Sequence, residues 1–448
     1  MQMQRQAATS KGLLRRLGDL KLAKVRDQRV AAKVEYPMKL LLTSLVVAMV
    51  TAARSLRDVE NRTQQIARNP EAGLGITTKI ADNTFGKVLP RADHGDVVAC
   101  LHRMVKAEHR RGNLKPTVLP VGTVAIDGKN VATLRWHDLC RVLGLKPSTA
   151  QPEQVKALLA ELYPEVQFCQ PEHGQPYALA RVHTVTLISS DAAFCIHQRP
   201  TLGHTNEIGS MPELLDEIHT GYGRTALITM VTTDAGNTSL KVAGLIIGRD
   251  WDYFLQIKSE HGDLYTEAVA ALEPLSPQQA GWTSSDTQNG KVVTYRVWQH
   301  DLTDEGWLSW THARQLVRVQ RTAEVPDTGE VTVGNRYYVS NTTPTELRAR
   351  ACGKISRAHW RCENETHWTA DAEVQEDRRR LAWSRHPKGV FVVSVLRRIA
   401  ANILAVARKM SRLGHCLETP TWHQVAEHFL LVLCVTILET ESFDAEIP

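Results

Sequence analysis

Two short β-branched runs of this sequence each lead directly into an aspartate. The segment TVAIDGKN at 123–130 contains Asp127, and the segment ITMVTTDAG at 228–236 contains Asp234. Short apolar runs of this kind, bounded by Gly or Pro, are typical of buried strands. If the two strands are neighbours, both carboxylates lie at one sheet edge, and hard divalent cations prefer carboxylate oxygens. The pattern is therefore typical of a metal site, although an aspartate after a strand is more often a turn residue or helix cap.

A third carboxylate could join them from the segment SRAHWRCENETHW at 356–368. On an α-helix, His359, Glu363 and His367 would share one stripe because they are spaced four residues apart. Two aspartates after strands and a glutamate on a helix suit two-metal phosphoryl transfer. Other acids compete with Glu363 for the third place: Glu365, Asp371, Glu373, Glu376 and Asp377. On a continuous helix the last two lie more than about 15 Å beyond Glu363, which favours Glu363.

Zinc is a different interpretation of the same segment. Cys352, His359, Cys362 and His367 are ligand types that zinc accepts, but their spacing fits no standard zinc finger. The carboxylate interpretation is therefore the one that we follow.

The pattern around the first two acids predicts an α/β domain. Strand-like segments are at 121–126, 181–189 and 193–198, with a predicted helical insertion at about 130–180 between the first two. A helix at 211–219 leads to the strand that ends in Asp234, and a helix at 239–248 leads to a strand at 253–257. Three strands followed by alternating helix and strand is the order of a ribonuclease-H-like domain.

The flanking segments have other patterns. The apolar run at 38–53 is shorter than the roughly 20 residues that span a bilayer, so we interpret it as a buried helix. Strand patterns at 291–299, 315–321 and 336–340 predict a β-rich insertion. We predict a ribonuclease-H-like catalytic domain with this insertion, a helical N-terminal domain and a helical C-terminal tail. The N-terminal domain is predicted at 1–115 and the tail at 401–448. The catalytic domain is predicted at 116–273 and 344–400, with the β-rich insertion at 274–343 between its two parts.

Composition limits the function classes. The chain has 448 residues, enough for two or three domains, and a net charge of +6, which is compatible with a polyanionic partner. A basic stretch, RMVKAEHRRGNLK at 103–115, precedes the predicted catalytic domain. The eight cysteines include no CxxC pair, which argues against a disulfide framework or a zinc ribbon. Free thiols without a cleavable signal favour the cytoplasm.

Several motifs occur together in one order along the chain. They are AIDGK at 125–129, TNEI at 205–208, MPELL at 211–215, TDA at 233–235, DYFLQIK at 252–258, RYYVS at 336–340, HWRCENETHW at 359–368 and QED at 375–377. In these motifs the chain resembles bacterial insertion-sequence transposases of the DDE type, specifically the ISAs family. The resemblance covers roughly residues 121–400 and implies a ribonuclease-H-like domain with a β-rich insertion before the last acid.

The resemblance also implies a chemistry. Asp127, Asp234 and Glu363 take the places of the family's metal ligands for Mg²⁺ (or Mn²⁺), with two ions expected. A water activated there attacks the phosphate at a transposon end, and the freed 3′-hydroxyl attacks target DNA. The expected partners are transposon-end and target DNA and further copies of the chain, as a homodimer or larger, in the bacterial cytoplasm at the nucleoid and without a membrane. Candidate DNA contacts are Lys129, Asn206, Lys258, Arg103, Arg110, Arg111 and His359, although His359 could equally pack beside tryptophans.

Four positions depart from the family's pattern. Ser239 stands where a glutamine is common, Glu260 and His261 stand where Asn-Gln is common, and His204 replaces a lysine. The three acids favour an active transposase. The departures leave open a decayed or repurposed transposase that acts only by binding DNA.

Overall fold

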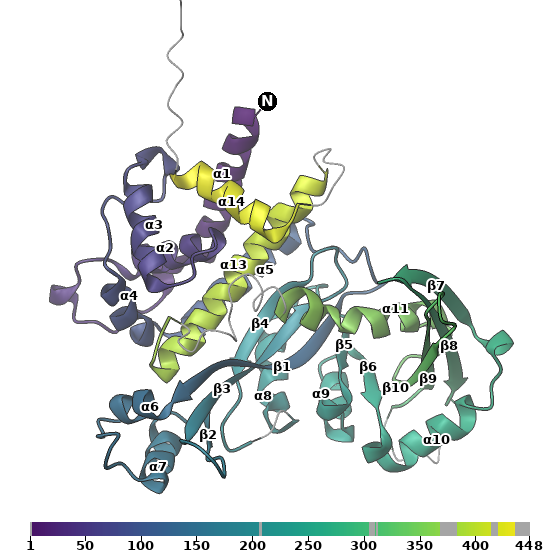
Figure 1. Ribbon diagram of the computed structural model, residues 1–448. Helices are drawn as coiled ribbons and strands as arrows, with labels where there is room; N and C mark the ends of the chain where they lie inside the picture. The colour runs from purple at the N-terminus through teal and green to yellow at the C-terminus, as the bar shows by residue number, and fades with distance from the viewer. Residues whose placement is uncertain are drawn as a thin grey trace, which may run out of the picture. The chain divides into compact units, whose positions relative to one another are not determined.

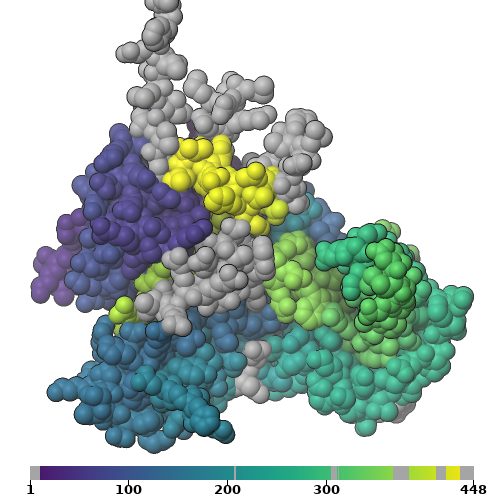
Figure 2. Space-filling view, viewed as in Figure 1, coloured from purple at the N-terminus to yellow at the C-terminus, as the bar shows by residue number. Residues whose placement is uncertain are grey.

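The computed structural model describes residues 2–205, 208–303, 310, 312–367, 383–413 and 420–434, and Figure 2 shows these residues in colour. The chain divides into two compact units. One comprises residues 1–104 and 370–448, and the other comprises residues 105–369. The division predicted from the sequence is finer than this, and its functional labels stay predictions.

The second unit is built on one mixed sheet of ten strands (Figure 1). The strand order is β2-β3-β1-β5-β6-β10-β9-β8-β7, and β4 pairs with β3. The strands are β1 Thr123–Arg135, β2 Val166–Cys169, β3 Tyr177–Leu187, β4 Phe194–Pro200, β5 Met230–Thr233, β6 Asp252–Ile257, β7 Trp282–Gln288, β8 Lys291–Asp301, β9 Gln315–Glu324 and β10 Val331–Ser340.

The central strands follow the predicted order. Strand β3 is antiparallel to both β1 and β4, whereas β1, β5 and β6 run parallel to one another. Parallel neighbours need crossover connections, which helices α8 Met211–Tyr222 and α9 Leu240–Ile247 supply before β5 and β6. The mixed α/β class and the order of these elements are confirmed.

Residues 130–180 differ from the predicted helical insertion. Strand β1 does not end at Asp127 but continues to Arg135, paired with β3 as far as the Arg135–Tyr177 pair. Only then do helices α6 Trp136–Val142 and α7 Pro152–Leu162 follow. The strand continues past Gly128 because β3, distant in sequence, offers a partner along its whole length.

The predicted β-rich insertion is a continuation of the same sheet. Strands β7 to β10 form an antiparallel ladder that joins the central strands where β10 pairs with β6. Strand β7 and helix α10 Gly262–Leu272 were not predicted. Sequence pattern had little to detect in β7, since most of its side chains are exposed and polar.

Helix α11 Ala349–His359 lies against the β7–β10 part of the sheet (Figure 1). Its residues Cys352 and Ile355 join a buried apolar cluster with Val297 and Val317 of the sheet. A Cβ atom on Gly353 would lie 2.5 Å from the ring of Trp282, so only glycine permits this approach of helix and strand. This packing sets the position, relative to the sheet, of the residues that follow α11, including Glu363.

The first unit is built from helices. They are α1 Gln2–Leu20, α2 Met38–Val50, α3 Leu56–Ala67, α4 Asp82–Val88, most of α5 His94–Arg110, α13 Pro387–Leu413 and α14 Trp422–Cys434. Helix α2 carries the apolar run at 38–53, and its Leu41, Leu42 and Leu45 are fully buried. The prediction of a buried helix is confirmed there.

One helical stretch, Pro387–Lys409 in α13, is long and apolar enough to cross a membrane. Of its most apolar window, 89% is buried inside the protein. Such burial is what the core helix of a folded unit shows.

Candidate active site

Asp127 lies within β1 and Asp234 directly follows β5, two strands that lie side by side. In the parallel ladder of β1 and β5, Ile126 pairs with Thr233, so the two aspartates come next in register. Neighbouring strands are about 4.8 Å apart, and side chains in register point to the same face. The structure thus places both aspartates at the end of this parallel pairing, as the sequence pattern predicted, although β1 itself continues beyond it.

Asp234 is held by the short helix that follows it. Its Oδ1 atom accepts hydrogen bonds from the backbone N–H of Asn237 at 3.1 Å and from the Asn237 side-chain amide at 2.9 Å. The hydroxyl of Thr238 donates to the Asp234 carbonyl oxygen at 2.9 Å. Asp234 therefore caps the short helix, as the alternative interpretation had it. These hydrogen bonds fix its carboxylate through Oδ1 and do not use Oδ2.

Glu363 lies in a π-helical turn, Cys362–His367, that follows α11. Helix α11 ends at His359 with Trp360 as its C-cap, so the single α-helix predicted for this segment is wrong. π-helical turns occur often at functional sites. Burial first, and then the charge of Asp234, raise the pKa of the Glu363 carboxyl, while Arg336 opposes the rise.

A buried thiol connects this turn with Asp127. The Sγ atom of Cys362 lies 3.9 Å from Oδ2 of Asp127. Burial raises the pKa of this thiol well above its usual value, and the negative charges of Asp127, Glu363 and Asp234 raise it further. Asp127 thus contacts this thiol, and the charges of all three carboxylates act on it. Within the part of the chain that the structure describes, no three Asp, Glu, His or Cys groups are assembled closely enough to hold a metal ion.

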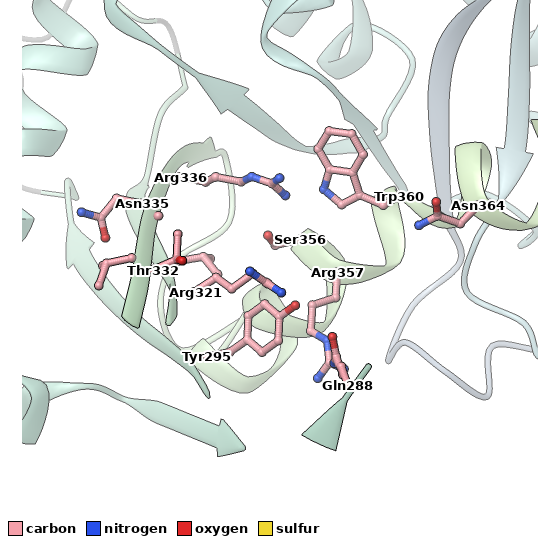
Figure 3. Close-up of a pocket in the computed structure, with 13 residues that line it drawn as sticks. Gln288, Tyr295, Arg321, Thr332, Asn335, Arg336, Ser356, Arg357, Trp360 and Asn364 are labelled. Carbon is pink, nitrogen blue, oxygen red and sulfur yellow. The ribbon is translucent and has the colours of Figure 1, made fainter. Parts of the chain in front are cut away.

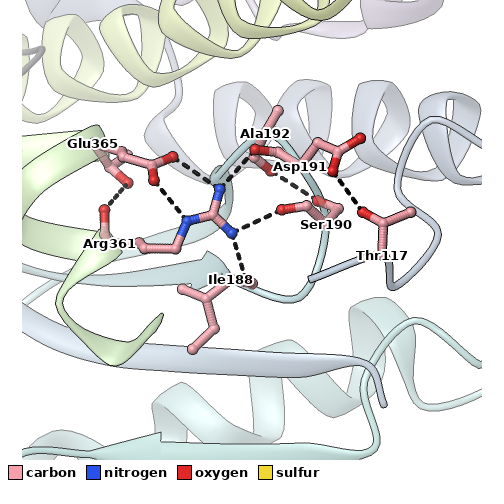
Figure 4. A network of polar contacts seen from close by, with 8 residues as sticks. Thr117, Ile188, Ser190, Asp191, Ala192, Arg361 and Glu365 are labelled. Carbon is pink, nitrogen blue, oxygen red and sulfur yellow. Dashed lines mark hydrogen bonds and ion pairs between the residues drawn. The ribbon is translucent and has the colours of Figure 1, made fainter. Parts of the chain in front are cut away.

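Arg361 anchors the Glu363 turn to the connection between β3 and β4 (Figure 4). Its Nη1 atom donates to the carbonyl oxygens of Ile188 at 2.6 Å and Ser190 at 2.8 Å, and its Nη2 atom donates to that of Asp191 at 2.7 Å. The guanidinium also pairs with Glu365 at 2.7 Å and 2.9 Å. One side chain thus satisfies three carbonyl groups and fixes the turn beside β1.

We expect Arg361→Met to loosen this turn. Removing the guanidinium leaves three carbonyls without their charged donor, and hydrogen bonds to charged groups contribute about 1.5–3 kcal/mol each. Hydrogen exchange of the amides at 188–192 and 362–366 should accelerate by roughly 100-fold.

Glu365→Gln is the matched control for Arg361→Met. It removes the charge of the ion pair, whose Glu365 side chain is 44% exposed, and keeps Arg361 with its three carbonyl contacts, so exchange should accelerate less than about fivefold. Equal protection in Arg361→Met and wild type would show that the network does not hold the turn.

The predicted DNA-contacting residues differ in their surroundings. Lys258 is exposed directly after β6, Arg110 is exposed at the end of α5, and Lys129 is half-buried in β1. Asn206 lies outside the described residues. Lys129 lies on β1 two residues after Asp127, and Lys258 follows β6, which pairs with β5; their contact with DNA phosphates stays a prediction.

Two of the predicted basic contacts have structural partners. Arg103 donates from Nε to the Leu20 carbonyl at the end of α1, at 2.9 Å. Arg111 pairs with the fully buried Glu108 at 2.8 Å. Loss of Arg103 would leave the Leu20 carbonyl without this donor, and loss of Arg111 would remove the charged partner of the buried Glu108, so these side chains are tied to the fold as well.

His359 is only 5% exposed, so its side chain is not on a surface that DNA reaches. Its Nδ1 atom lies 3.4 Å from the hydroxyl of Thr232 in β5. Burial lowers the pKa of its imidazole to about 4. Its role in the structure is packing, which was the alternative interpretation of this histidine.

We expect acid to destabilise the protein partly through His359. Its pKa in the fold, about 4, is below the ordinary 6.5, so the unfolded chain binds the extra proton as the pH falls from 6.5 towards 4. Stability should therefore drop by about 2 kcal/mol between pH 7 and pH 5 through this group. Urea unfolding of wild type and His359→Asn at both pH values measures it. The pH-dependent loss should be smaller in the variant, and an equal loss in both proteins would contradict the assignment.

The departures from the family pattern have local roles. Ser239 caps helix α9, because its Oγ accepts from the backbone N–H of Val242 at 3.2 Å. The Nδ1 atom of His261 lies 3.0 Å from the Lys258 backbone nitrogen, and its Nε2 atom lies 3.2 Å from the Thr238 carbonyl oxygen. His261 thereby links the loops that follow β5 and β6. His204 and Glu260 are exposed.

Sequence reasoning missed three residues that shape this site. Arg361, Cys362 and Arg336 all lie inside recognised motifs, but Cys362 was considered only as a zinc ligand and the two arginines were not considered. An arginine two residues before a candidate ligand is a signal that could have directed attention to Arg361. No local pattern reveals that the charge of Arg336, on β10, lowers the pKa of the Glu363 carboxyl and so opposes its rise.

Comparison with known proteins matches the central part of the chain to one family. Residues 165–387 match the family described as Transposase DDE domain. The match contains Asp234 and Glu363 and begins after Asp127. In the solved structures, a cryo-EM structure of the piggyBac transposase synaptic complex with hairpin DNA aligns over 94% of this chain and 76% of that chain, at 11% identity and a TM-score of 0.39. That score is too low to support any argument.

Three Escherichia coli proteins are similar over half of this chain. "Putative protein YbfL" of strain K12 is 28% identical over 233 residues, covering 50% of this chain and 58% of that protein. "H repeat-associated putative transposase YhhI" of strain K12 is 28% identical with the same two coverages. "Putative transposase YncI" of O157:H7 is 24% identical over 230 residues, covering 50% and 56%. The matched stretch thus spans somewhat over half the length of these relatives.

Proposed function

We propose, because residues 165–387 belong to the Transposase DDE domain family, that this protein is an insertion-sequence DNA transposase of the ISAs type with Asp127, Asp234 and Glu363 as its acidic triad. One observation carries the assignment of the triad. Asp127 and Asp234 directly follow the last pair of the β1–β5 ladder, Ile126 and Thr233, and the Cys362 thiol lies 3.9 Å from Asp127 and is acted on by the charges of all three carboxylates. The central strand order also supports a ribonuclease-H-like domain.

The donor set fits hard divalent cations in type. All three groups are carboxylates, and the neighbouring negative charge that raises the Glu363 pKa is the kind of repulsion that a cation relieves. Mg²⁺ (or Mn²⁺), with two ions expected, would be held by Asp127, Asp234 and Glu363. When bound, such ions polarise the phosphate and lower the pKa of a water nucleophile.

The chain's own residues prepare this site. Asn237 fixes the Asp234 carboxylate through Oδ1, and Arg361 fixes the turn that carries Glu363. Glu363 is the most exposed of the three carboxylates and lies in a turn rather than a strand. It can therefore adjust its position when DNA enters, while the two aspartates keep the register of the sheet.

The proposal is tested with duplex DNA that carries the inverted repeats flanking the coding sequence. We expect strand cleavage that leaves a 3′-hydroxyl at the repeat end in Mg²⁺ or Mn²⁺, and none in EDTA. Specific binding of the repeats without cleavage in either metal would favour the decayed transposase that only binds DNA. A protein that neither binds nor cleaves this DNA would contradict both functions.

A further inference from the structure

A pocket of about 490 Å³ lies between strands β8 to β10 and helix α11 (Figure 3). It reaches Asn364, the residue directly after Glu363, so it adjoins the proposed triad. No Asp or Glu is among the described residues that line it. Besides Asn364, the side chains that matter for its chemistry are Tyr295, Arg321, Arg336, Arg357 and Trp360.

Two of the arginines lie over aromatic rings. The Arg336 guanidinium lies 4.5 Å from the ring centre of Trp360, and that of Arg357 lies 4.6 Å from the ring centre of Tyr295. A guanidinium stacked by its face keeps its N–H groups at the edge, where they remain available to an acceptor. Arg357 also pairs with Asp286 at 3.1 Å, so part of its charge is already compensated.

Three donors of the pocket can bind an acceptor there, and one of them, Arg336, also hydrogen-bonds the Tyr338 hydroxyl. Arg321 and Arg336 are exposed, and neither has an ion-pair partner among the residues that the structure describes. The indole N–H of Trp360 is buried and has no acceptor in the same set of residues. In Figure 3 the indole nitrogen lies on the side of the ring that faces Arg336 and Ser356. An unsatisfied buried donor costs about 1–3 kcal/mol, which an oxygen ligand at this point would recover.

The position of the pocket indicates which oxyanion it would receive. Arg336 is close enough for its charge to act on the Glu363 carboxyl. Each strand of duplex DNA carries one negative charge per about 3.4 Å of helix axis. A strand whose reacting phosphate lies at the triad therefore brings further phosphates to the neighbouring surface.

We propose that this pocket binds a backbone phosphate of the DNA strand that continues from the reacting position, with Arg321, Arg336 and the Trp360 indole N–H as donors. The inference rests on the proposed function, since it takes DNA as the substrate. Such a contact carries no sequence information but sets the register of the strand. It would hold DNA beside Glu363 independently of the three carboxylates.

Arg321→Gln tests the proposal, with Arg350→Gln as its matched control. Arg350 is also exposed and belongs to α11, but it does not line the pocket. The probe is a fluorescein-labelled duplex carrying the inverted repeat, measured by anisotropy in Ca²⁺ over a range of NaCl concentrations. Arg321→Gln should weaken binding about fivefold to tenfold and reduce the slope of log K against log salt by about one. Arg350→Gln should change affinity less than twofold.

Neutral methylphosphonate linkages, introduced one at a time, locate the phosphate. In wild type and Arg350→Gln, neutralising the bound phosphate should weaken binding about fivefold, whereas in Arg321→Gln the same linkage should have no effect. If every linkage acts equally in all three proteins, or Arg321→Gln behaves like Arg350→Gln, the pocket does not bind the DNA backbone.

Free anions are the other source of the same chemistry. Titration with inorganic phosphate and with deoxyadenosine monophosphate distinguishes them. Arg321-dependent binding of either anion, with unchanged DNA affinity, would overturn the proposal in favour of a small-molecule site. Normal cleavage with no Arg321 effect refutes only this pocket, whereas absence of any DNA binding or cleavage by wild type refutes the proposed function.

Discussion

Asp127→Asn is expected to reduce Mg²⁺-dependent cleavage of end-containing DNA by at least about 1,000-fold, which corresponds to about 4 kcal/mol of activation free energy. The reason is that Asp127 comes next to Asp234 in the β1–β5 register, so its carboxylate is one of two acids that the sheet itself places together. Asparagine keeps the size of the side chain and removes its charge. DNA affinity should stay within about threefold, because it depends on basic contacts spread over many phosphates.

Asp263→Asn is the matched control for Asp127→Asn. Asp263 is an exposed acid in the first turn of α10, so the same chemical change there should leave cleavage unchanged. Cleavage rates under single-turnover conditions and anisotropy in Ca²⁺ separate chemistry from binding. If Asp127→Asn cleaves as fast as Asp263→Asn, Asp127 is not a metal ligand and the triad must be reassigned.

Glu363→Gln is expected to lose most of the Mg²⁺-dependent activity, by roughly 100-fold or more, while the fold is kept. Glu363 is exposed, and burial of its carboxyl together with the charge of Asp234 raises its pKa. When the pKa of a carboxyl is raised in the fold, the stability that this group contributes to the protein is lost as the pH increases through that pKa. At pH 8 the Glu363→Gln variant, with its neutral side chain, should therefore melt at the same temperature as wild type or slightly above it.

Glu376→Gln should be assayed beside Glu363→Gln, because Glu376 was the rival third acid and lies outside the described residues. We expect Glu376→Gln to retain activity. An inactive Glu376→Gln together with an active Glu363→Gln would show that the third ligand was assigned to the wrong residue. Activity in both variants would remove this segment from the site.

Local sequence pattern was sufficient to predict an element wherever the structure of that element depends on its own residues. The β-branched runs before Asp127 and Asp234 specify strands, and two parallel strands with a helical crossover are placed so that both ends meet at one edge. The burial of α2 and the antiparallel strands β8 to β10 were predicted for the same reason, since apolar periodicity is a property of the segment itself.

Tertiary structure decided the features that depend on partners distant in sequence. Strand β1 passes Gly128 because β3 pairs with it there, and His359 is buried because α11 brings it to Thr232 of β5. The π-helical turn that carries Glu363 is held by Arg361 through carbonyls more than 150 residues earlier, from Ile188 to Asp191. The sequence alone therefore proposed the three candidate acids and predicted the two neighbouring strands beside which two of them lie. Only the folded chain determined how the third acid is presented, because its hydrogen bonds come from residues that no local pattern connects.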